Sequence, residues 1–193
     1  GLTMTKMERK ASLRIVHNSD LTFENVEVPE EYRLQKINSF ADMAPIMSTL
    51  RPDVAWVAAG LQAGAYEAAL KYAVERQQFG RPIAGFQMVQ DKLVRMLGNV
   101  TASISMVVRL AQVRQGGVKR EEDAALAKVW VAARMRETVA LAREVVGGNG
   151  ILIDHDVMRF FTDAESVYTY EGTNEINTLI VGRSITGLSA FIR

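Results

Sequence analysis

A helical repeat of apolar side chains, sustained over most of the chain, constrains the fold more than any other feature. Apolar residues recur at spacings of three and four and predict a long helix over residues 45–76, which Pro52 either restarts or kinks. Glycine runs close two further predicted helices, over residues 87–115 and 121–146. A fourth helix is predicted over residues 175–186. Four helices with short connections favour an up-and-down four-helix bundle.

The N-terminal part of the chain follows a strand-like pattern instead. Alternation over residues 21–28, with a slip at Asn25, predicts a bulged strand that ends at Pro29. One strand needs ladder partners, and few candidates exist downstream, so we expect its sheet to lie upstream in a longer protein. We therefore divide the chain into the truncated end of a β-domain with a linker, residues 1–38, and a helical domain, residues 39–193.

Composition excludes several kinds of site. The 193 residues are 48% hydrophobic, enough for one main body, and 23 basic against 22 acidic residues leave a net charge of +1. We therefore expect no nucleic-acid partner and no membrane partner. The longest uncharged apolar stretch, residues 54–66, is too short to span a bilayer. The chain has no cysteine and only two distant histidines, so we expect no metal site.

One carboxylate stands out as a candidate catalytic group. Glu171 is followed directly by Gly172 and Thr173, just before the last predicted helix. Glycine lets a ligand approach the backbone closely, and threonine can cap the helix. The alternative is that Thr173 caps a surface helix and Glu171 only complements the helix dipole.

The connection after the first helix is a candidate dinucleotide site. Residues 76–83 and 86–90 contain two arginines, a glycine, a proline and two phenylalanines. A guanidinium can bind a diphosphate while an aromatic ring lies against a purine. The alternative is a turn whose aromatics join the helices while its arginines face water. The run Gly147 to Gly150 is first a helix stop, and second a place where a cofactor could meet bare backbone.

In order and spacing, these segments resemble the acyl-CoA dehydrogenase and acyl-CoA oxidase superfamily. The matching pieces are residues 76–82 with Phe86-Gln87, residues 142–144 with 147–150, residues 170–173, and Gly182-Arg183 with Thr186-Gly187. The resemblance covers the whole chain and implies the end of the family's middle β-domain followed by its C-terminal four-helix domain. Residues 54–56, 170–173 and 185–187 with Phe191 are most similar to glutaryl-CoA dehydrogenase and to short-chain acyl-CoA oxidases of plants.

The resemblance implies an FAD-dependent enzyme that introduces a double bond between Cα and Cβ of an acyl-CoA thioester. By position, Glu171 corresponds to the base that removes the α-proton, and its backbone N–H to part of the site that binds the thioester oxygen. The α-proton of a thioester is only weakly acidic, so its removal requires a site that polarises the carbonyl and excludes water. Some relatives carry the base just before the arginine that matches Arg51. Leu50 stands there and cannot take a proton.

The resemblance also assigns binding residues near the base. Arg51 matches an arginine of the substrate pocket, and Gly172 would let the acyl chain pass. Thr173 and Glu175 match flavin contacts, and Phe191 would close the far end of the cofactor site. Tyr168 and Tyr170 are better interpreted as packing residues.

A second group of residues corresponds to contacts with the cofactor of a neighbouring subunit. The implied contacts are Arg76, Phe79, Gln87, Glu144, Val145, Val146, Gly147 and Gly148. Many relatives have glutamine at the position of Glu144, and a carboxylate beside a diphosphate would repel it. We expect Glu171 to lie in a crevice bordered by the arginine-rich turn and the glycine run.

The resemblance implies a homotetramer that shares FAD across subunits, an acyl-CoA substrate, and electron-transferring flavoprotein as the electron acceptor. We expect a bacterial cytoplasmic protein, or a mitochondrial matrix protein if it is eukaryotic, and we expect the 193 residues alone to be inactive. Two alternatives stay open: an oxidase that passes electrons to oxygen, and a non-catalytic helical assembly module.

Overall fold

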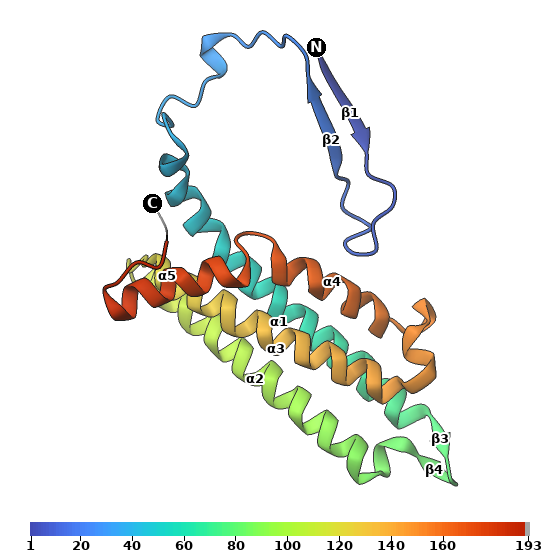
Figure 1. Ribbon diagram of the computed structural model, residues 1–193. Helices are drawn as coiled ribbons and strands as arrows, with labels where there is room; N and C mark the ends of the chain where they lie inside the picture. The colour runs from blue at the N-terminus through green and yellow to red at the C-terminus, as the bar shows by residue number, and fades with distance from the viewer. Residues whose placement is uncertain (192–193) are drawn as a thin grey trace.

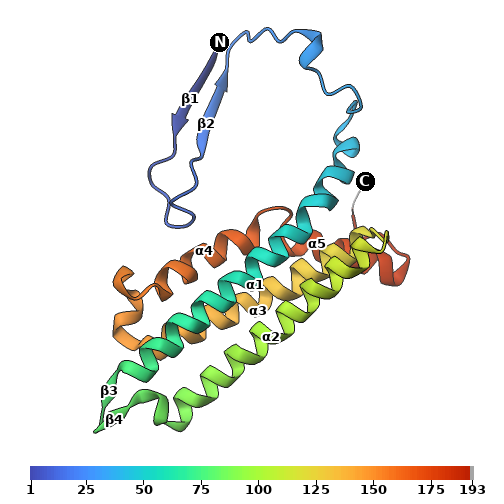
Figure 2. The same ribbon diagram turned by 180° about the vertical axis from the view of Figure 1, so that it is seen from behind.

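The computed structural model describes residues 1–191 and is dominated by α-helices (Figures 1 and 2). The α-helices are α1 (Ala44–Glu75), α2 (Gln87–Gln115), α3 (Glu121–Val146), α4 (Val157–Thr169) and α5 (Asn174–Thr186). Short 3₁₀ helices span Glu30–Tyr32, Phe40–Met43, Ile83–Gly85, Gly147–Ile151 and Ile153–His155. The predicted bounds of α2 and α3 are confirmed, and α1 runs on through Pro52 without ending there.

Helices α1 to α4 form the predicted up-and-down bundle. Gln62 of α1 bonds Ser103 of α2 and Val131 of α3, while Arg51 bonds Glu121 at the start of α3. These pairs show that α1 and α3 run parallel to each other and antiparallel to α2. Helix α4 runs antiparallel to α1, because Gly64 meets its residue Phe160 while Arg51 lies near the turn after its C-terminal end.

The prediction of which helix completes the bundle is wrong. The fourth bundle helix is α4, which the sequence analysis omitted, and the predicted fourth helix is α5, which packs against α3. A physical reason lies at the N-terminus of α4. Its N-cap residue Asp156 is of a type that favours helix starts, but it has a left-handed backbone (φ 54°) and its carboxylate bonds Arg159, so α4 begins without the usual capping hydrogen bond.

Small residues bring α1 and α3 close together. Ala55, Ala65, Ala69 and Ala73 of α1 are fully buried, and they face a core that contains Met135 of α3. Alanine keeps the helix propensity high and lets two backbones approach. The core therefore lies along the α1–α3 contact, with α2 and α4 on either side (Figure 1).

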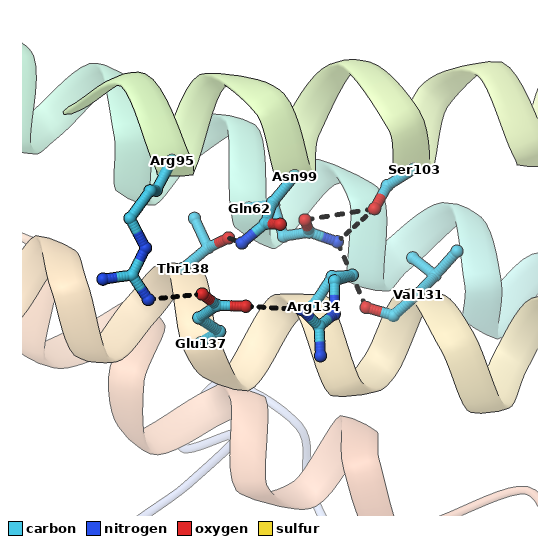
Figure 3. A network of polar contacts seen from close by, with 8 residues as sticks. All are labelled: Gln62, Arg95, Asn99, Ser103, Val131, Arg134, Glu137 and Thr138. Atoms are coloured by element: carbon cyan, nitrogen blue, oxygen red, sulfur yellow. Dashed lines mark hydrogen bonds and ion pairs between the residues drawn. The ribbon is translucent and has the colours of Figure 1, made fainter. Parts of the chain in front are cut away.

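Polar groups fix the register of the three long helices (Figure 3). Gln62 Nε2 donates to Ser103 Oγ at 2.9 Å and to Val131 O at 3.2 Å, and Ser103 Oγ donates back to Gln62 Oε1 at 3.1 Å. Nearer the surface, Glu137 accepts a hydrogen bond of 2.7 Å from Arg95, which lowers the pKa of the Glu137 carboxyl. A buried polar network of this kind allows only one sliding position of the helices, since any other leaves donors unpaired.

The N-terminal residues form a hairpin whose strands lie away from the bundle (Figures 1 and 2), while its loop contacts α4 through a hydrogen bond of 2.6 Å from Leu13 N to the carboxylate of Asp163. Strands β1 (Leu2–Lys6) and β2 (Ser19–Phe23) pair antiparallel, with Leu2 opposite Phe23 and Lys6 opposite Ser19. The predicted strand therefore ends at Phe23 rather than at Pro29, because Asn25 takes a left-handed conformation (φ 49°). Its ladder partner lies upstream as expected, but within this chain. A two-residue ladder, β3 (Gln77–Gln78) with β4 (Arg81–Pro82), forms a second hairpin after α1.

Within the described residues, α2 is the one helix long and apolar enough to cross a membrane by length and composition. One-third of its most apolar window, 33%, is buried in the bundle. A core helix of a water-soluble bundle passes the same test. The finding is therefore weak evidence for a membrane span.

Candidate functional site

The turn between α4 and α5 holds Glu171 in a strained backbone conformation. Glu171 has φ 57° and Gly172 has φ 86°, so two consecutive residues are left-handed. Thr173 then caps α5 as predicted, because its Oγ1 accepts a hydrogen bond from Ile176 N at 3.3 Å. A left-handed glutamate is costly and persists only where its surroundings impose it.

Arg51 lies beside this turn, as predicted for a residue near the base. The residue is only 6% exposed, and its Nη1 bonds the carboxylate of Glu121, which begins α3. A Cβ placed on Gly172 would lie 3.8 Å from Arg51 Nε, so the guanidinium borders the glycine directly. The ion pair to Glu121 thus holds a cation against the turn that carries Glu171.

Lys128 of α3 is a site residue that the sequence analysis missed. It is 0% exposed, and its Nζ donates to Tyr168 O at 2.8 Å and to Gly172 O at 2.7 Å. Burial lowers the pKa of Lys128 to about 8, although the carboxylates of Glu175 and Glu171 oppose this effect. A signal was available, since position 128 falls on the same helix stripe as the buried Ala124 and Val131.

The same turn gathers buried polar atoms that have no hydrogen-bond partner among the described residues. Five such atoms occur among the described residues, and four of them lie in this turn or in the helices beside it: Arg51 Nε, Glu171 Oε2, Asn174 Oδ1 and Asn177 Oδ1. Buried polar groups are nearly always paired, so a cluster of unpaired ones marks a place built for polar contacts beyond those within the fold. Burial also raises the pKa of the neighbouring Tyr170, with a smaller contribution from the Glu171 charge.

The arginine-rich turn and the glycine run meet at a cleft of about 370 Å³ at the other end of the bundle. Five of the predicted cofactor residues line it: Arg76, Val145, Val146, Gly147 and Gly148. Tyr72 and Asn149 also line it, and Asn149 Nδ2 donates to Tyr72 Oη at 3.0 Å. Gly147 is left-handed (φ 64°) and ends α3, so bare backbone faces the cleft beside a guanidinium. Such a surface suits an anionic ligand.

Phe79 and Gln87 lie at the same end of the bundle but do not line the cleft. Phe79 is 91% exposed at the tip of the β3–β4 hairpin and contacts Phe86 edge to face, with ring centroids 6.0 Å apart. Gln87 is the first residue of α2 and is exposed. Both positions leave the side chains free to reach a ligand from outside the cleft.

Glu144 and Phe191 are placed differently from the cleft residues. Glu144 forms an ion pair of 2.9 Å with Lys92 of α2, which neutralises the charge that a diphosphate would meet. Phe191 lies beyond the end of α5 and is partly exposed. Thr173 and Glu175 lie at the start of α5, beside Glu171. Hydrogen bonds from the backbone amide of Glu175 and from the Thr173 side chain lower the pKa of the Glu175 carboxyl.

The two groups of residues do not form one crevice, so the expectation that Glu171 borders the arginine-rich turn is wrong. Arg51 lies in the N-terminal part of α1 and Arg76 directly follows its last residue, and the helical rise of 1.5 Å per residue separates them by roughly 37 Å. The polar turn and the cleft are therefore two separate half-sites on one chain. The separation agrees with the implied assignment of the arginine-rich turn and the glycine run to the cofactor of a neighbouring subunit, and it contradicts only the single crevice expected around Glu171.

The bundle and its two polar ends are those of a known helical domain class. Residues 41–186 match the family model described as the C-terminal domain of acyl-CoA dehydrogenase. The chain belongs to the acyl-CoA dehydrogenase family.

Named relatives agree with this placement. The chain is 34% identical over 188 residues to an acyl-CoA dehydrogenase of Bacillus subtilis, covering 97% of this chain and 50% of that protein. It is 31% identical to subunit CarC of the caffeyl-CoA reductase–Etf complex of Acetobacterium woodii, covering 94% of this chain and 48% of that one. A glutaryl-CoA dehydrogenase of Mycobacterium smegmatis in complex with FADH2 superimposes with a TM-score of 0.95 at 27% identity, covering 100% and 50%. The chain thus spans about half the length of the relatives it matches.

Proposed function

We propose that this chain is the C-terminal half of an FAD-dependent acyl-CoA dehydrogenase in which Glu171 is the catalytic base. One observation carries the proposal: a carboxylate oxygen of Glu171 is buried without a hydrogen-bond partner, on a strained turn beside Arg51. An unpaired, partly desolvated carboxylate can accept a proton from a weak carbon acid. A structural carboxylate at a helix start would be paired or solvated instead.

The residues present fit FAD at both half-sites. Arg76 and the backbone of Gly147 and Gly148 would hold the diphosphate portion, since a guanidinium and free N–H groups both bind phosphate. Phe79 offers an exposed ring for the adenine. At the other half-site, Thr173 and Glu175 would lie against the flavin portion. When bound, FAD supplies the acceptor for the hydride that leaves Cβ.

The residues of the protein itself would position the base and let it accept the proton. Glu171 would take the α-proton of the thioester, while its backbone N–H would bind the thioester oxygen. Gly172 leaves room for the acyl chain, and Arg51, which borders this glycine, would line the substrate pocket. The half-buried Tyr170 and the buried Lys128 help keep water from the turn.

Two copies of the chain would be needed to build one complete cofactor site. The half-sites are about 37 Å apart along α1, estimated from the helical rise, and this exceeds the reach of one extended dinucleotide. The cleft of one subunit would therefore complete the flavin site of another, in a homotetramer. We infer that the 193 residues alone are inactive, that glutaryl-CoA is the candidate acyl-CoA substrate, and that an electron-transferring flavoprotein accepts the electrons, as the Etf complex of one relative suggests.

The test replaces the base in the complete gene product with FAD bound. Glu171→Gln removes the proton acceptor with little change in shape, and loss of a general base typically costs about 10²–10⁴-fold. Flavin reduction is followed by its bleaching, with a panel of acyl-CoA esters. Glu165→Gln is the matched control, since Glu165 is an exposed carboxylate of α4 paired with Arg136. Reduction by the Glu171→Gln protein at the unaltered rate would remove the assignment.

A further inference from the structure

We propose that Lys128 is the positioning residue of Glu171: its buried ammonium ties down both ends of the turn that carries the base. This inference rests on the proposed function of Glu171. Lys128 bonds backbone carbonyls rather than the carboxylate of Glu171, so its role is to fix geometry rather than to react.

The contacts of Lys128 bracket the base. Its Nζ donates to the carbonyl of Tyr168, in the last turn of α4, and to the carbonyl of Gly172, just after Glu171. The distances of 2.8 and 2.7 Å are those of strong charge-assisted bonds. One side chain from α3 thus fixes the carbonyls on both sides of the left-handed residue.

A second donor, from α5, acts on the same carbonyl. Asn177 Nδ2 donates to Gly172 O at 2.8 Å and to Thr173 O at 3.1 Å. Asn177 fixes only the exit of the turn, because both of its acceptors follow Glu171. Among the described residues, Lys128 is the side chain that bonds both the entry and the exit, so its loss frees the segment 168–172 to leave the strained conformation.

The cost of burying Lys128 supports a specific role. The residue is fully buried on the stripe of α3 that otherwise carries alanine and valine, and a charged group placed there is costly unless it is bonded. Burial and the nearby Arg51 both lower the pKa of Lys128, while Glu175 and Glu171 raise it. An apolar residue would fill the position at lower cost if packing were the only requirement.

The test compares substitutions of two lysines in the complete FAD-bound gene product. Lys128→Met keeps the length of the side chain and removes every donor. Lys71→Met is the control, because Lys71 is exposed on α1. We expect Lys128→Met to lower kcat for flavin reduction by about 10²-fold, the effect of misplacing a reacting group by about 1 Å, with KM little changed. Hydrogen exchange of residues 168–173, followed by mass spectrometry, should speed up in Lys128→Met and stay unchanged in Lys71→Met.

The outcomes separate positioning from a merely structural role. A Lys128→Met protein that loses thermal stability but keeps kcat and slow exchange in the segment 168–173 would overturn the proposal. If that variant does not fold, Lys128→Gln decides by the same two measurements, since its shorter amide retains a donor. The Glu171→Gln protein in the same assay tests the proposed function separately. The exchange measurement tests whether Lys128 holds the segment 168–173 in place, whether or not Glu171 is the base.

Discussion

Glu171 and Gly172 form a pair of left-handed residues, and only the glycine, which lacks a Cβ, adopts that conformation without strain. The glutamate is kept there by bonds made to its neighbours rather than by its own side chain, whose Oε2 is unpaired. Strain at a single residue is typical of positions where a reactive group must be aimed. The turn therefore separates two tasks, with structure carried by backbone carbonyls and chemistry left to the carboxylate.

Gly172 should not tolerate a side chain. A Cβ at its φ of 86° would lie 3.0 Å from Asn177 Nδ2, which holds the exit of the turn. We expect Gly172→Ala to lower the free energy of unfolding by about 1–2 kcal/mol, the cost of a left-handed alanine, and to slow flavin reduction. Gly182→Ala is the control, since Gly182 lies in α5 with open space around it. Chemical denaturation checks the first effect, and equal stability of the two variants would contradict it.

At the same scale, the sequence predicted the site residues that are adjacent in the chain and missed the one that tertiary packing brings from another helix. Glu171, Gly172 and Thr173 are adjacent in the sequence, so the turn and the cap of α5 could both be predicted. Lys128 reaches the turn from the middle of α3, and only the packing of α3 against α4 and α5 brings it there. The sequence pattern showed one charge on an apolar stripe and nothing about its partners.

At the scale of elements, glycines decide how closely α1 can approach α4. Gly64 and Gly60 stand one helical turn apart on α1, and their surroundings differ. A Cβ on Gly64 would lie 2.6 Å from the ring of Phe160 of α4, whereas nothing lies within 4 Å of a Cβ on Gly60. The two positions are a natural pair for measuring the contact between the helices.

Alanine should have opposite effects at these two positions. Gly60→Ala should raise the free energy of unfolding by about 0.5–1 kcal/mol, because alanine favours the helix. Gly64→Ala should lower it by about 1–3 kcal/mol, because the ring of Phe160 must move. Urea titration of both variants measures the difference, and Phe160→Leu should restore part of the loss. A Gly64→Ala protein as stable as Gly60→Ala would mean that the ring moves without cost.

Helix boundaries were predictable where a stop signal was present. Gly116 caps the C-terminus of α2 and Gly147 that of α3, and both helix ends were predicted from these glycines. Helix α4 has the highest contrast between its apolar and polar faces but no capping side chain, and it was missed. Its absence from the prediction also moved the fourth bundle position to α5. A pattern without a boundary signal is the weakest basis for placing an element.

At the scale of the whole molecule, α2 presents more apolar surface than one bundle covers. Its buried stripe is Leu93, Met96, Val100, Ser103, Val107 and Leu110. A second stripe one residue further on is exposed and consists of Val94, Leu97, Thr101, Ile104 and Val108. Its spacing of three and four is that of a helix seam. Because the proposed function divides each cofactor site between two chains, a second copy of the chain is the partner that we expect this stripe to meet.

Charges placed on this outer stripe should dissociate the assembly. We expect Leu97→Glu with Ile104→Glu to convert the complete gene product from an oligomer to monomers, with loss of bound FAD, because each cofactor would lose the cleft of the other subunit. Analytical ultracentrifugation gives the mass, and absorbance at the flavin band gives the occupancy. Ile15→Glu is the control, since Ile15 is an apolar residue that is 90% exposed and lies in the N-terminal hairpin rather than on α2. An unchanged mass would mean that the stripe meets another partner. If the unaltered gene product binds lipid vesicles and the double variant does not, that partner is a bilayer.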